Sequence, residues 1–383
     1  MKENIYRNTN CGELRITDVG KQVRMAGWVN SIRKLGGITF VTLRDHYGLT
    51  QLTVDEEKIV GIGKETVISV SGTVIERSSK NPHMPTGDIE VVVSEIKVLG
   101  ECTQALPFEI ADVTAPEDAR LKYRYLNLRN PHMHDIIVKR SKILNFVRNK
   151  MNDLGFVEVQ TPILTSSSPE GARDYIVPTI NAPGKFFALP QAPQQFKQLL
   201  MVSGFDKYFQ IAPCFRNEAA RADRTPGEFY QIDFEMSFAT QEDVFAVAEE
   251  LATGIYGNFT DMKVCKAPFV RLTWKEAREK YASDKPDLRN PLTVTTLTDI
   301  FKNTNFSVYQ GKTIKAIVAP CEGQSRKFFD EMTKFILDLE GKGLTWFKFA
   351  DGALSGSALK FLSEDEIAKM TACLLWQTLS RAR

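Results

Sequence analysis

Residues 207–240 read KYFQIAPCFRNEAARADRTPGEFYQIDFEMSFAT, and this stretch predicts the fold of the central part of the chain. Its two arms, 207–215 and 228–238, alternate aromatic or β-branched residues with polar ones at a period of two, which is typical of β-strands. A loop dense in charge joins the two arms. We therefore expect an antiparallel pair of strands.

Polar side chains line one face of the second predicted strand. Gln231, Asp233 and Glu235 are spaced two residues apart, so their side chains share one side of the strand. Arg216 and Glu218 follow the end of the first strand. Three polar side chains on one face of a mostly apolar strand predict a lined pocket. A solvated sheet face with ordinary ion pairs explains the same pattern equally well.

The order F-R-N-E, then R-A-D-R, then Q-I-D-F-E resembles motif 2 of the class II aminoacyl-tRNA synthetases, and with residues 161–204 it is similar to the bacterial aspartyl family. That resemblance implies activation of aspartate by ATP, with charge building on the α-phosphate oxygens, for which a fixed guanidinium is a suitable clamp. It gives this catalytic role to Arg216, and contact with the adenine amino group to Glu218. The loop from Asn217 to Arg224 would hold the ATP tail and the tRNA acceptor end. The implied ATP contacts are Arg216, Asn217, Glu218, Thr225 and Gln231.

Residues 165–204 carry the prediction of the substrate. The segment TSSSPEGARDY (165–175) is polar and contains Gly and Pro, so it predicts a loop. It resembles the flipping loop that closes over bound aspartate in that family. By the same resemblance Lys197 holds the β-carboxylate, and a buried cation there would reject neutral isosteres. Taken alone, Lys197 is typical of a lysine on a helix surface. The implied aspartate contacts are Glu170, Gln194, Gln195, Lys197, Arg216 and Asp233.

The first 107 residues predict a small all-β domain. Five runs alternate or are rich in β-formers, and they span residues 22–32, 38–44, 49–54, 66–76 and 89–99. Gly36-Gly37 separates the first two runs as in a hairpin. Five short strands in about a hundred residues suit an OB-fold β-barrel, which commonly binds oligonucleotides.

Arg33, Phe40 and Gln51 lie on or beside the second and third predicted strands, where a ring can stack an unpaired base and Arg or Gln can read its edge. On pattern alone, a core Phe40 and a solvent-facing Gln51 are the simpler interpretation. The order G-W-V-N-S-I-R, F-V-T-L-R-D and G-L-T-Q-L-T-V, however, resembles the anticodon-binding domain of the same family. That resemblance implies anticodon contacts for Arg33, Phe40 and Gln51, with Glu90 as a weaker candidate. Leu35 stands where relatives that charge both tRNA(Asp) and tRNA(Asn) tend to carry His.

The rest of the chain divides into four predicted parts. Residues 108–133 predict a hinge, with a capping box from Thr114 to Glu117. Residues 134–287 would form a catalytic domain, which begins with a long helix (134–155) and a strand ending at Pro162. This helix and strand resemble motif 1, which implies a homodimer. Residues 288–375 resemble the inserted GAD-like domain, and 376–383 are an aberrant tail. The predicted fold class is multidomain, with an OB-fold β-barrel, a class II synthetase α+β antiparallel-sheet domain that is incomplete, and a partial α+β insertion.

Composition limits the other possibilities. The formal net charge is +2 with 25% charged residues, so a nucleic-acid site has to be local. The six cysteines have no close pairs or metal spacing, which favours reduced thiols in the cytoplasm. We predict no metal site in the sequence given. We also predict no membrane span and no secretory signal, because no apolar run is long enough and the N-terminus has no apolar core.

The resemblance is incomplete, because no counterpart of motif 3 follows the inserted domain. The family's second ATP arginine and its acidic Mg²⁺ ligands belong to that missing part. We therefore expect a truncated chain that folds its barrel but has a damaged active site. Three interpretations stay open. The first is an aspartate–tRNA ligase that uses ATP and Mg²⁺ and charges tRNA(Asp), either alone or together with tRNA(Asn). The second is a non-catalytic tRNA-binding fragment, and the third is a small-molecule ligase such as an asparagine synthetase. The barrel domain argues against the third.

Overall fold

The structure is a computed structural model that describes residues 4–168, 170–219, 227–321, 323–350 and 352–381, with side chains as far as residue 374. Thr225, one of the predicted ATP contacts, lies outside the described residues. By their contacts, the residues form two compact units, Met1–Leu144 and Asn145–Arg383. Each unit is described by itself.

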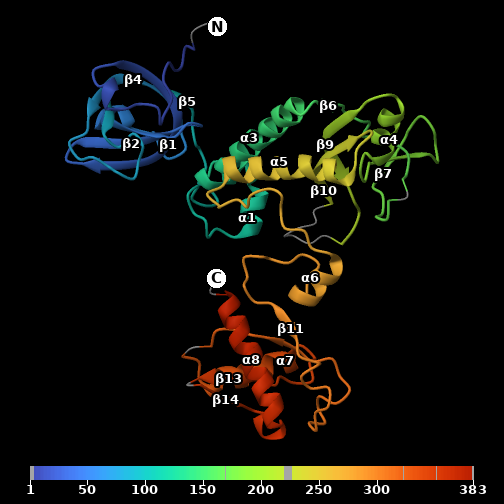
Figure 1. Ribbon diagram of the computed structural model, residues 1–383. Helices are drawn as coiled ribbons and strands as arrows, with labels where there is room; N and C mark the ends of the chain where they lie inside the picture. Colours follow the sequence, from blue (N-terminus) through green and yellow to red (C-terminus); the bar gives the residue numbers. More distant parts are fainter. Residues whose placement is uncertain (1–3, 169, 220–226, 322, 351, 382–383) are drawn as a thin grey trace. The chain divides into compact units, whose positions relative to one another are not determined.

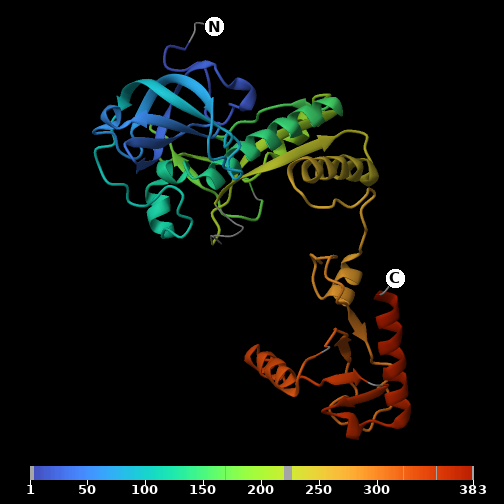
Figure 2. The same cartoon turned by 90° about the vertical axis from the view of Figure 1, so that its left-hand side faces the viewer.

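The first unit contains a closed five-stranded barrel, as predicted. Its strands follow the order β1-β2-β3-β5-β4 around the barrel. Figures 1 and 2 show it from two directions at right angles. The bounds are β1 (Gln22–Leu35), β2 (Ile38–Arg44), β3 (Leu49–Asp55), β4 (Val67–Glu76) and β5 (Ile89–Gly100). Short 3-10 helices lie at Ile16–Asp18 and Glu56–Ile59.

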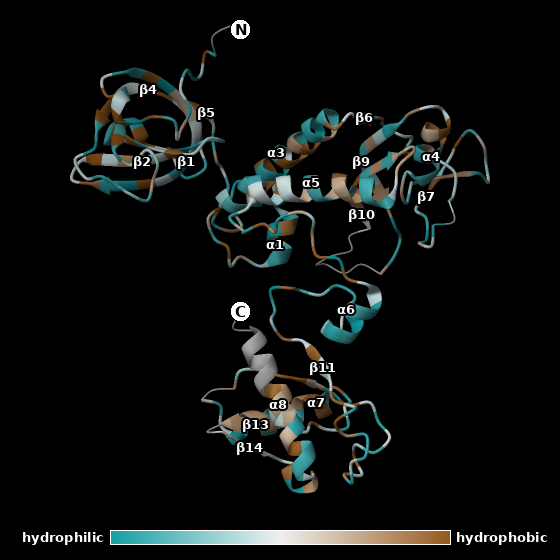
Figure 3. Ribbon diagram, in the orientation of Figure 1, coloured by the Kyte–Doolittle hydropathy of each residue, from teal (hydrophilic) through white to brown (hydrophobic). Residues whose placement is uncertain are grey.

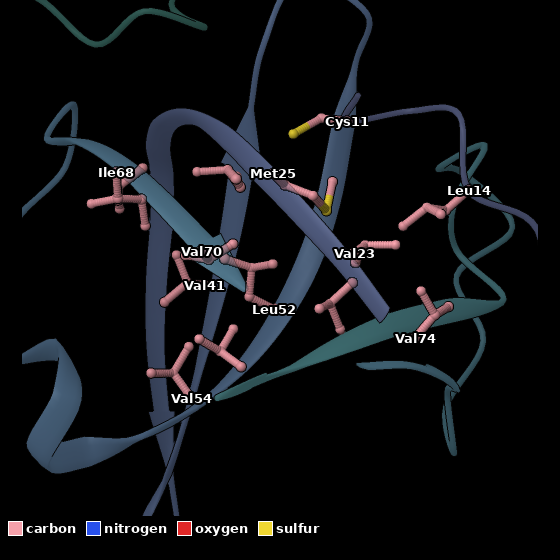
Figure 4. Packing of buried hydrophobic residues seen from close by; sticks show 14 of the residues in the cluster. Cys11, Leu14, Val23, Met25, Val41, Leu52, Val54, Ile68, Val70 and Val74 are labelled. Carbon is pink, nitrogen blue, oxygen red and sulfur yellow. The ribbon is translucent and has the colours of Figure 1, made fainter. Parts of the chain in front are cut away.

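Alternation along the strands makes the barrel interior apolar. Every second residue is buried from Val23 to Val29 in β1 and along β2 and β3, and Figure 3 shows hydrophobic and hydrophilic segments alternating along the barrel. The buried side chains form one cluster, part of which is drawn in Figure 4, and its fully buried members include Met25, Leu43, Leu52 and Ile68. Gly27 allows close strand approach, because a Cβ there would lie 2.3 Å from the carbonyl oxygen of Arg44.

The hinge contains two short helices where one was expected. Helix α1 (Glu117–Lys122) and helix α2 (Arg124–Asn127) are separated at Tyr123. The predicted capping box is wrong, because Pro116 is the N-cap and no side chain caps the helix. Thr114 instead donates from its hydroxyl and its backbone N–H to Asp112 Oδ1, at 2.7 and 2.8 Å. This local turn competes with the helix start for the threonine hydroxyl.

The second unit contains a three-stranded sheet, in the order β10-β9-β6. The expected antiparallel pair is present, as β9 (Lys207–Phe215) runs against β10 (Glu228–Met236), while β6 (Val157–Glu158) pairs in parallel with β9. Two helices accompany the sheet, α3 (Pro131–Asp153) and α5 (Gln241–Phe259). They pack closely, since a Cβ on Gly254 would lie 2.5 Å from the Phe146 ring.

The remaining elements are shorter. Helix α4 (Gln194–Val202) contacts β9 and β10, and β7 (Ile176–Pro178) pairs with β8 (Phe186–Ala188), whereas α6 (Trp274–Tyr281) contacts β11. The C-terminal part holds the two-stranded ladders β11 (Val294–Thr296) with β12 (Lys315–Ile317) and β13 (Phe347–Ala350) with β14 (Ala353–Gly356), the helices α7 (Arg326–Asp338) and α8 (Glu364–Arg381), and a 3-10 turn at Leu359–Phe361. Within the described residues, no helix has both the length and the apolar character that crossing a membrane requires.

Candidate functional site

A lysine from a helix meets the polar face of the sheet. Helix α4 supplies Lys197, whose Nζ donates to Asp233 Oδ1 at 3.0 Å and lies 3.1 Å from Glu235 Oε2. The carboxylates share one face because they stand two residues apart on β10. The Lys197 and Asp233 side chains are only 12% and 13% exposed. The sequence pattern could not predict that the helix meets the strand here, because Lys197 and Asp233 are 36 residues apart in the chain.

The pKa values of Lys197 and Asp233 both lie above their ordinary values, for different reasons. Burial lowers the pKa of Lys197, but hydrogen bonds and charge from Asp233 and Glu235 outweigh it, so the pKa lies above its ordinary value. Burial also raises the pKa of Asp233, and the Lys197 hydrogen bond offsets only part of that rise. The ammonium is therefore firmly charged, and the aspartate is easier to protonate than usual.

One oxygen of Asp233 is left without a donor. Its Oδ2 is buried and accepts no hydrogen bond from any residue that the structure describes. The neighbouring Tyr208 hydroxyl donates to Gln210 Oε1 at 2.8 Å. A buried carboxylate oxygen without a donor is costly, so this atom fits a ligand that brings an N–H group.

Arg216 lies immediately after the end of β9, the central strand of the same sheet. Its Nε donates to the backbone carbonyl of Gln191 at 3.4 Å, and its Cζ lies 5.1 Å from the centre of the Phe229 ring. Ring and carbonyl together limit the orientations of the guanidinium. Asn217 and Glu218 follow it and are exposed.

Gln231 lies on the β10 face that carries Asp233. Its Oε1 accepts from the buried Cys214 Sγ at 3.1 Å. Burial raises the pKa of the Cys214 thiol to about 11, so this neighbour stays protonated and serves as a donor. This hydrogen bond fixes the orientation of the Gln231 amide.

The predicted substrate loop lies against the start of α4. Glu170 is partly buried, and its Oε1 accepts from Ser168 Oγ at 3.1 Å. Gln194 and Gln195 begin helix α4, the first partly buried and the second exposed. A pocket between this loop and the helix has Ser168, Glu170, Asp174, Gln191, Gln195 and Phe196 in its lining.

The sequence pattern missed Gln191. This residue is 1% exposed and hydrogen-bonds the loop through its side chain. It stands between β8 and α4, where neither a helical nor a strand period marks it. A polar residue beside Pro190 gives no signal of burial, so only the folded loop shows its contacts.

The anticodon candidates gather on the outer face of the barrel. Phe40 is paired with Arg33 across β1 and β2, and the guanidinium lies 5.7 Å from the ring centre. Its neighbours Thr39 and Val41 point into the barrel, so the ring is on the outside. The interpretation of Phe40 as a core residue is therefore wrong.

Gln51 also lies on this outer face, on β3. Its Nε2 donates to Glu90 Oε2 at 2.6 Å, which fixes the amide. Glu90 itself is 9% exposed. Leu35 is 65% exposed at the end of β1, beside the hairpin glycines. These residues form a surface on which an aromatic ring and an oriented amide are available to a ligand.

We find no metal site in the part of the chain that the structure describes, because it holds no group of three or more His, Cys, Asp or Glu side chains placed to bind an ion. All six cysteines are free thiols.

Comparison with known proteins gives the family. Residues 116–349 match the tRNA synthetases class II (D, K and N), and residues 23–99 match the OB-fold nucleic acid binding domain. An aspartate–tRNA ligase of Streptomyces avermitilis is 50% identical over 376 residues, which are 96% of this chain. An aspartate–tRNA(Asp/Asn) ligase of Rickettsia bellii is 48% identical over 383 residues. The chain spans 64% of the length of both relatives.

Solved structures agree at the level of the fold. An asparaginyl-tRNA synthetase from Pyrococcus horikoshii, complexed with asparaginyl-adenylate, superposes with a TM-score of 0.59 and 27% identity, over 67% of this chain and 58% of that one. A putative aspartyl-tRNA synthetase from Leishmania major superposes with a TM-score of 0.59 and 25% identity, over 67% of this chain and 54% of that one. Because the family match extends over more than half of its length, the chain belongs to the class II tRNA synthetases of the D, K and N group.

Proposed function

We propose that this chain is the anticodon-binding and aspartate-activating part of an aspartate–tRNA ligase. The observation that carries the proposal is the arrangement of Lys197 and Asp233. Lys197 Nζ supplies a cation for a side-chain carboxylate, and the unpartnered Asp233 Oδ2 supplies an acceptor for an α-ammonium group. An acidic amino acid satisfies both, whereas a neutral one leaves the cation without a new partner. The names of the relatives support this choice.

In the proposed reaction, a carboxylate oxygen of aspartate attacks the α-phosphorus of ATP and pyrophosphate leaves. Arg216 stabilises the charge that develops on the α-phosphate oxygens, and it is the catalytic residue of this chain. Gln194, Gln195 and Glu170 complete the contacts with aspartate. The terminal ribose hydroxyl of tRNA then attacks the aspartyl carbonyl, and AMP leaves.

ATP contacts are proposed for Arg216, Asn217, Glu218, Thr225 and Gln231. The exposure of Asn217 and Glu218 leaves their polar groups available to a ligand. The family as a whole uses ATP and Mg²⁺, the ion supporting the phosphates. We assign no Mg²⁺ ligand in this chain, and no step here is attributed to the ion.

The barrel is the proposed anticodon site. Phe40 would stack a base, while Arg33 and Gln51, the latter held by Glu90, would read base edges. The substrate is tRNA(Asp), and Leu35 at the position discussed above favours discrimination against tRNA(Asn). A homodimer built on residues 134–162 and a cytoplasmic location complete the proposal. The six free cysteines are consistent with that location.

The test is ATP–pyrophosphate exchange with this chain and with a version extended by the family's C-terminal half, each supplied separately with L-aspartate, L-asparagine and L-lysine. We expect aspartate-dependent exchange in the extended version, little or none in this chain, and its loss in the extended Arg216→Lys variant, which keeps the charge but not the planar fork. A preference for asparagine or lysine would overturn the assignment. Binding of tRNA without exchange by any amino acid would favour the non-catalytic tRNA-binding interpretation instead.

A further inference from the structure

Gln191 is a buried amide whose side-chain hydrogen bonds all go to one loop. Its Nε2 donates to Asp174 Oδ1 at 2.6 Å and to the Ala172 carbonyl at 2.9 Å, with the Ser168 carbonyl at 3.5 Å. Its Oε1 accepts from the Ala172 N–H at 3.1 Å. Since the side chain is 1% exposed, no water competes for these bonds, and their loss would leave buried polar groups unpaired.

The same residue also contacts the catalytic arginine. The backbone carbonyl of Gln191 accepts from Arg216 Nε at 3.4 Å. The loop reaches this region by a second route, because Arg173 and Asn217 exchange hydrogen bonds: the Asn217 N–H donates to the Arg173 carbonyl at 2.9 Å, and Arg173 Nε donates to the Asn217 carbonyl at 3.2 Å. Loop and arginine are thus held by one connected set of hydrogen bonds.

The loop carries the residue expected to face the substrate ammonium. Glu170 lies two residues before Ala172, and both Glu170 and Gln191 belong to the lining of the pocket at the start of α4. If the bonds from Gln191 to Ala172 and Asp174 were broken, Glu170 would lose the anchor that sets its distance from the pocket.

We propose that Gln191 is a positioning residue that fixes the loop at Ala172 and Asp174. It thereby holds Glu170 over the aspartate site at a fixed position relative to Arg216. This inference rests on the proposed function. Gln191 has no part in the proposed reaction itself, and acts through the loop and the arginine. The amide is required because it both donates and accepts within one buried side chain.

Gln191→Glu is the sharpest perturbation. It keeps the volume and one acceptor oxygen for the Ala172 N–H, but it replaces the donor by an oxygen facing Asp174 and the Ala172 carbonyl. Acceptors opposed at these distances repel, so the loop is expected to detach. Gln198→Glu is the matched control, because it makes the same chemical change at an exposed position of the helix that follows Gln191, α4.

The first readout is hydrogen exchange of the Ala172 amide in the free protein, without any substrate. We expect at least about tenfold faster exchange in Gln191→Glu than in the wild type and in Gln198→Glu, as the loss of about one hydrogen bond predicts. An unchanged exchange rate would overturn the inference. If Gln191→Glu does not fold, Asp174→Ala removes one acceptor from the loop side and is expected to change the rate in the same direction.

The second readout is the calorimetric affinity for L-aspartate. We expect the Kd of Gln191→Glu to rise by about tenfold or more, with circular dichroism unchanged. Faster exchange with an unchanged Kd would contradict the positioning role. The double variant Gln191→Glu/Asp174→Asn again places a donor opposite an acceptor, and should recover part of both effects; no recovery would contradict the pairing. If the wild type binds no aspartate, the proposed function fails, while the exchange rates still decide whether Gln191 holds the loop.

Discussion

Replacing Lys197 by methionine tests the basis of substrate choice. Methionine keeps most of the length and the apolar stem but removes the ammonium that lies 3.0 Å from Asp233 and 3.1 Å from Glu235. In the proposed complex, the same ammonium binds the side-chain carboxylate of aspartate. We therefore expect Lys197→Met to weaken binding of L-aspartate much more than binding of L-asparagine.

The geometry gives the magnitude. Two unit charges 3.0 Å apart interact by about 5 kcal/mol at an effective dielectric constant of about 20. Removing one partner of a buried, hydrogen-bonded charge pair costs about 2–5 kcal/mol by experiment. The Lys197 side chain is 12% exposed, which places it among such buried groups. We take about 3 kcal/mol for aspartate, or a Kd more than about 100-fold higher, and about tenfold at most for asparagine.

The assay is isothermal titration calorimetry of both amino acids against the wild type, Lys197→Met and the control Lys185→Met. Lys185 is exposed, so its loss should leave both affinities unchanged. Circular dichroism and thermal unfolding check that the variant is folded, because the two carboxylates lose their counter-ion. If Lys197→Met keeps the wild-type preference for aspartate over asparagine, the argument from charge fails.

Three further predictions follow from individual contacts. Glu65→Gln should lower the free energy of unfolding by about 3 kcal/mol in urea titration, because it leaves the buried Arg44 guanidinium without its bidentate carboxylate; a loss below about 1 kcal/mol would contradict this. Phe40→Ala should weaken binding of an anticodon stem-loop in fluorescence anisotropy by about 5- to 150-fold without lowering the Tm, since the ring lies outside the barrel core; equal affinity would refute the stacking role. As the pH is lowered, the affinity for aspartate should begin to fall at a higher pH than it would if Asp233 had the ordinary pKa of 3.8, because the raised pKa of Asp233 means that its negative charge is lost sooner. Asp233→Asn should lack this pH dependence in calorimetry.

Much of the fold was predictable because its elements carry local patterns. A barrel strand has one face toward solvent and one toward the core, so period-two alternation of polar and apolar residues marked all five strands. The hairpin at Gly36-Gly37 was predicted from its two glycines. The start of α5 is local in the same way, since Thr240 and Asp243 form a reciprocal capping box. In each case, the residues that determine the element lie within a few positions of one another.

Predictions that needed distant partners succeeded less well. The run ending at Pro162 was expected to be a strand throughout, but only Val157–Glu158 pairs, because β9 offers parallel partners at Tyr208 and Phe209 alone. In the helix predicted at 134–155, Val147 and Met151 are buried, whereas Ile136 and Ile137 stay 43% and 49% exposed. Burial depends on what the rest of the fold brings to a face, and periodicity does not contain that information.

The candidate site shows the same division. That Gln231, Asp233 and Glu235 share a face follows from strand geometry, and the structure places them so. That Lys197 reaches them was implied only by resemblance, because a helix lysine is most often solvated. Gln191 had no signal at all, since its partners form only when the loop folds back on it.

The charges at the site explain why an amino acid, and not merely an anion, is the fitting ligand. Lys197, Asp233 and Glu235 together carry a formal charge of −1 when ionised, so an incoming carboxylate competes with two carboxylates that already bind the ammonium. The α-ammonium of an amino acid offsets this repulsion, and the buried Asp233 Oδ2 is an acceptor without a donor among the described residues. Binding of the ammonium at Asp233 would weaken the hold of that carboxylate on Lys197 and free part of the lysine's charge for the substrate side chain. Recognition of the two ends of aspartate is therefore coupled through a single ion pair, which is why Lys197 and Asp233 have to be tested together with the ligand's two charges.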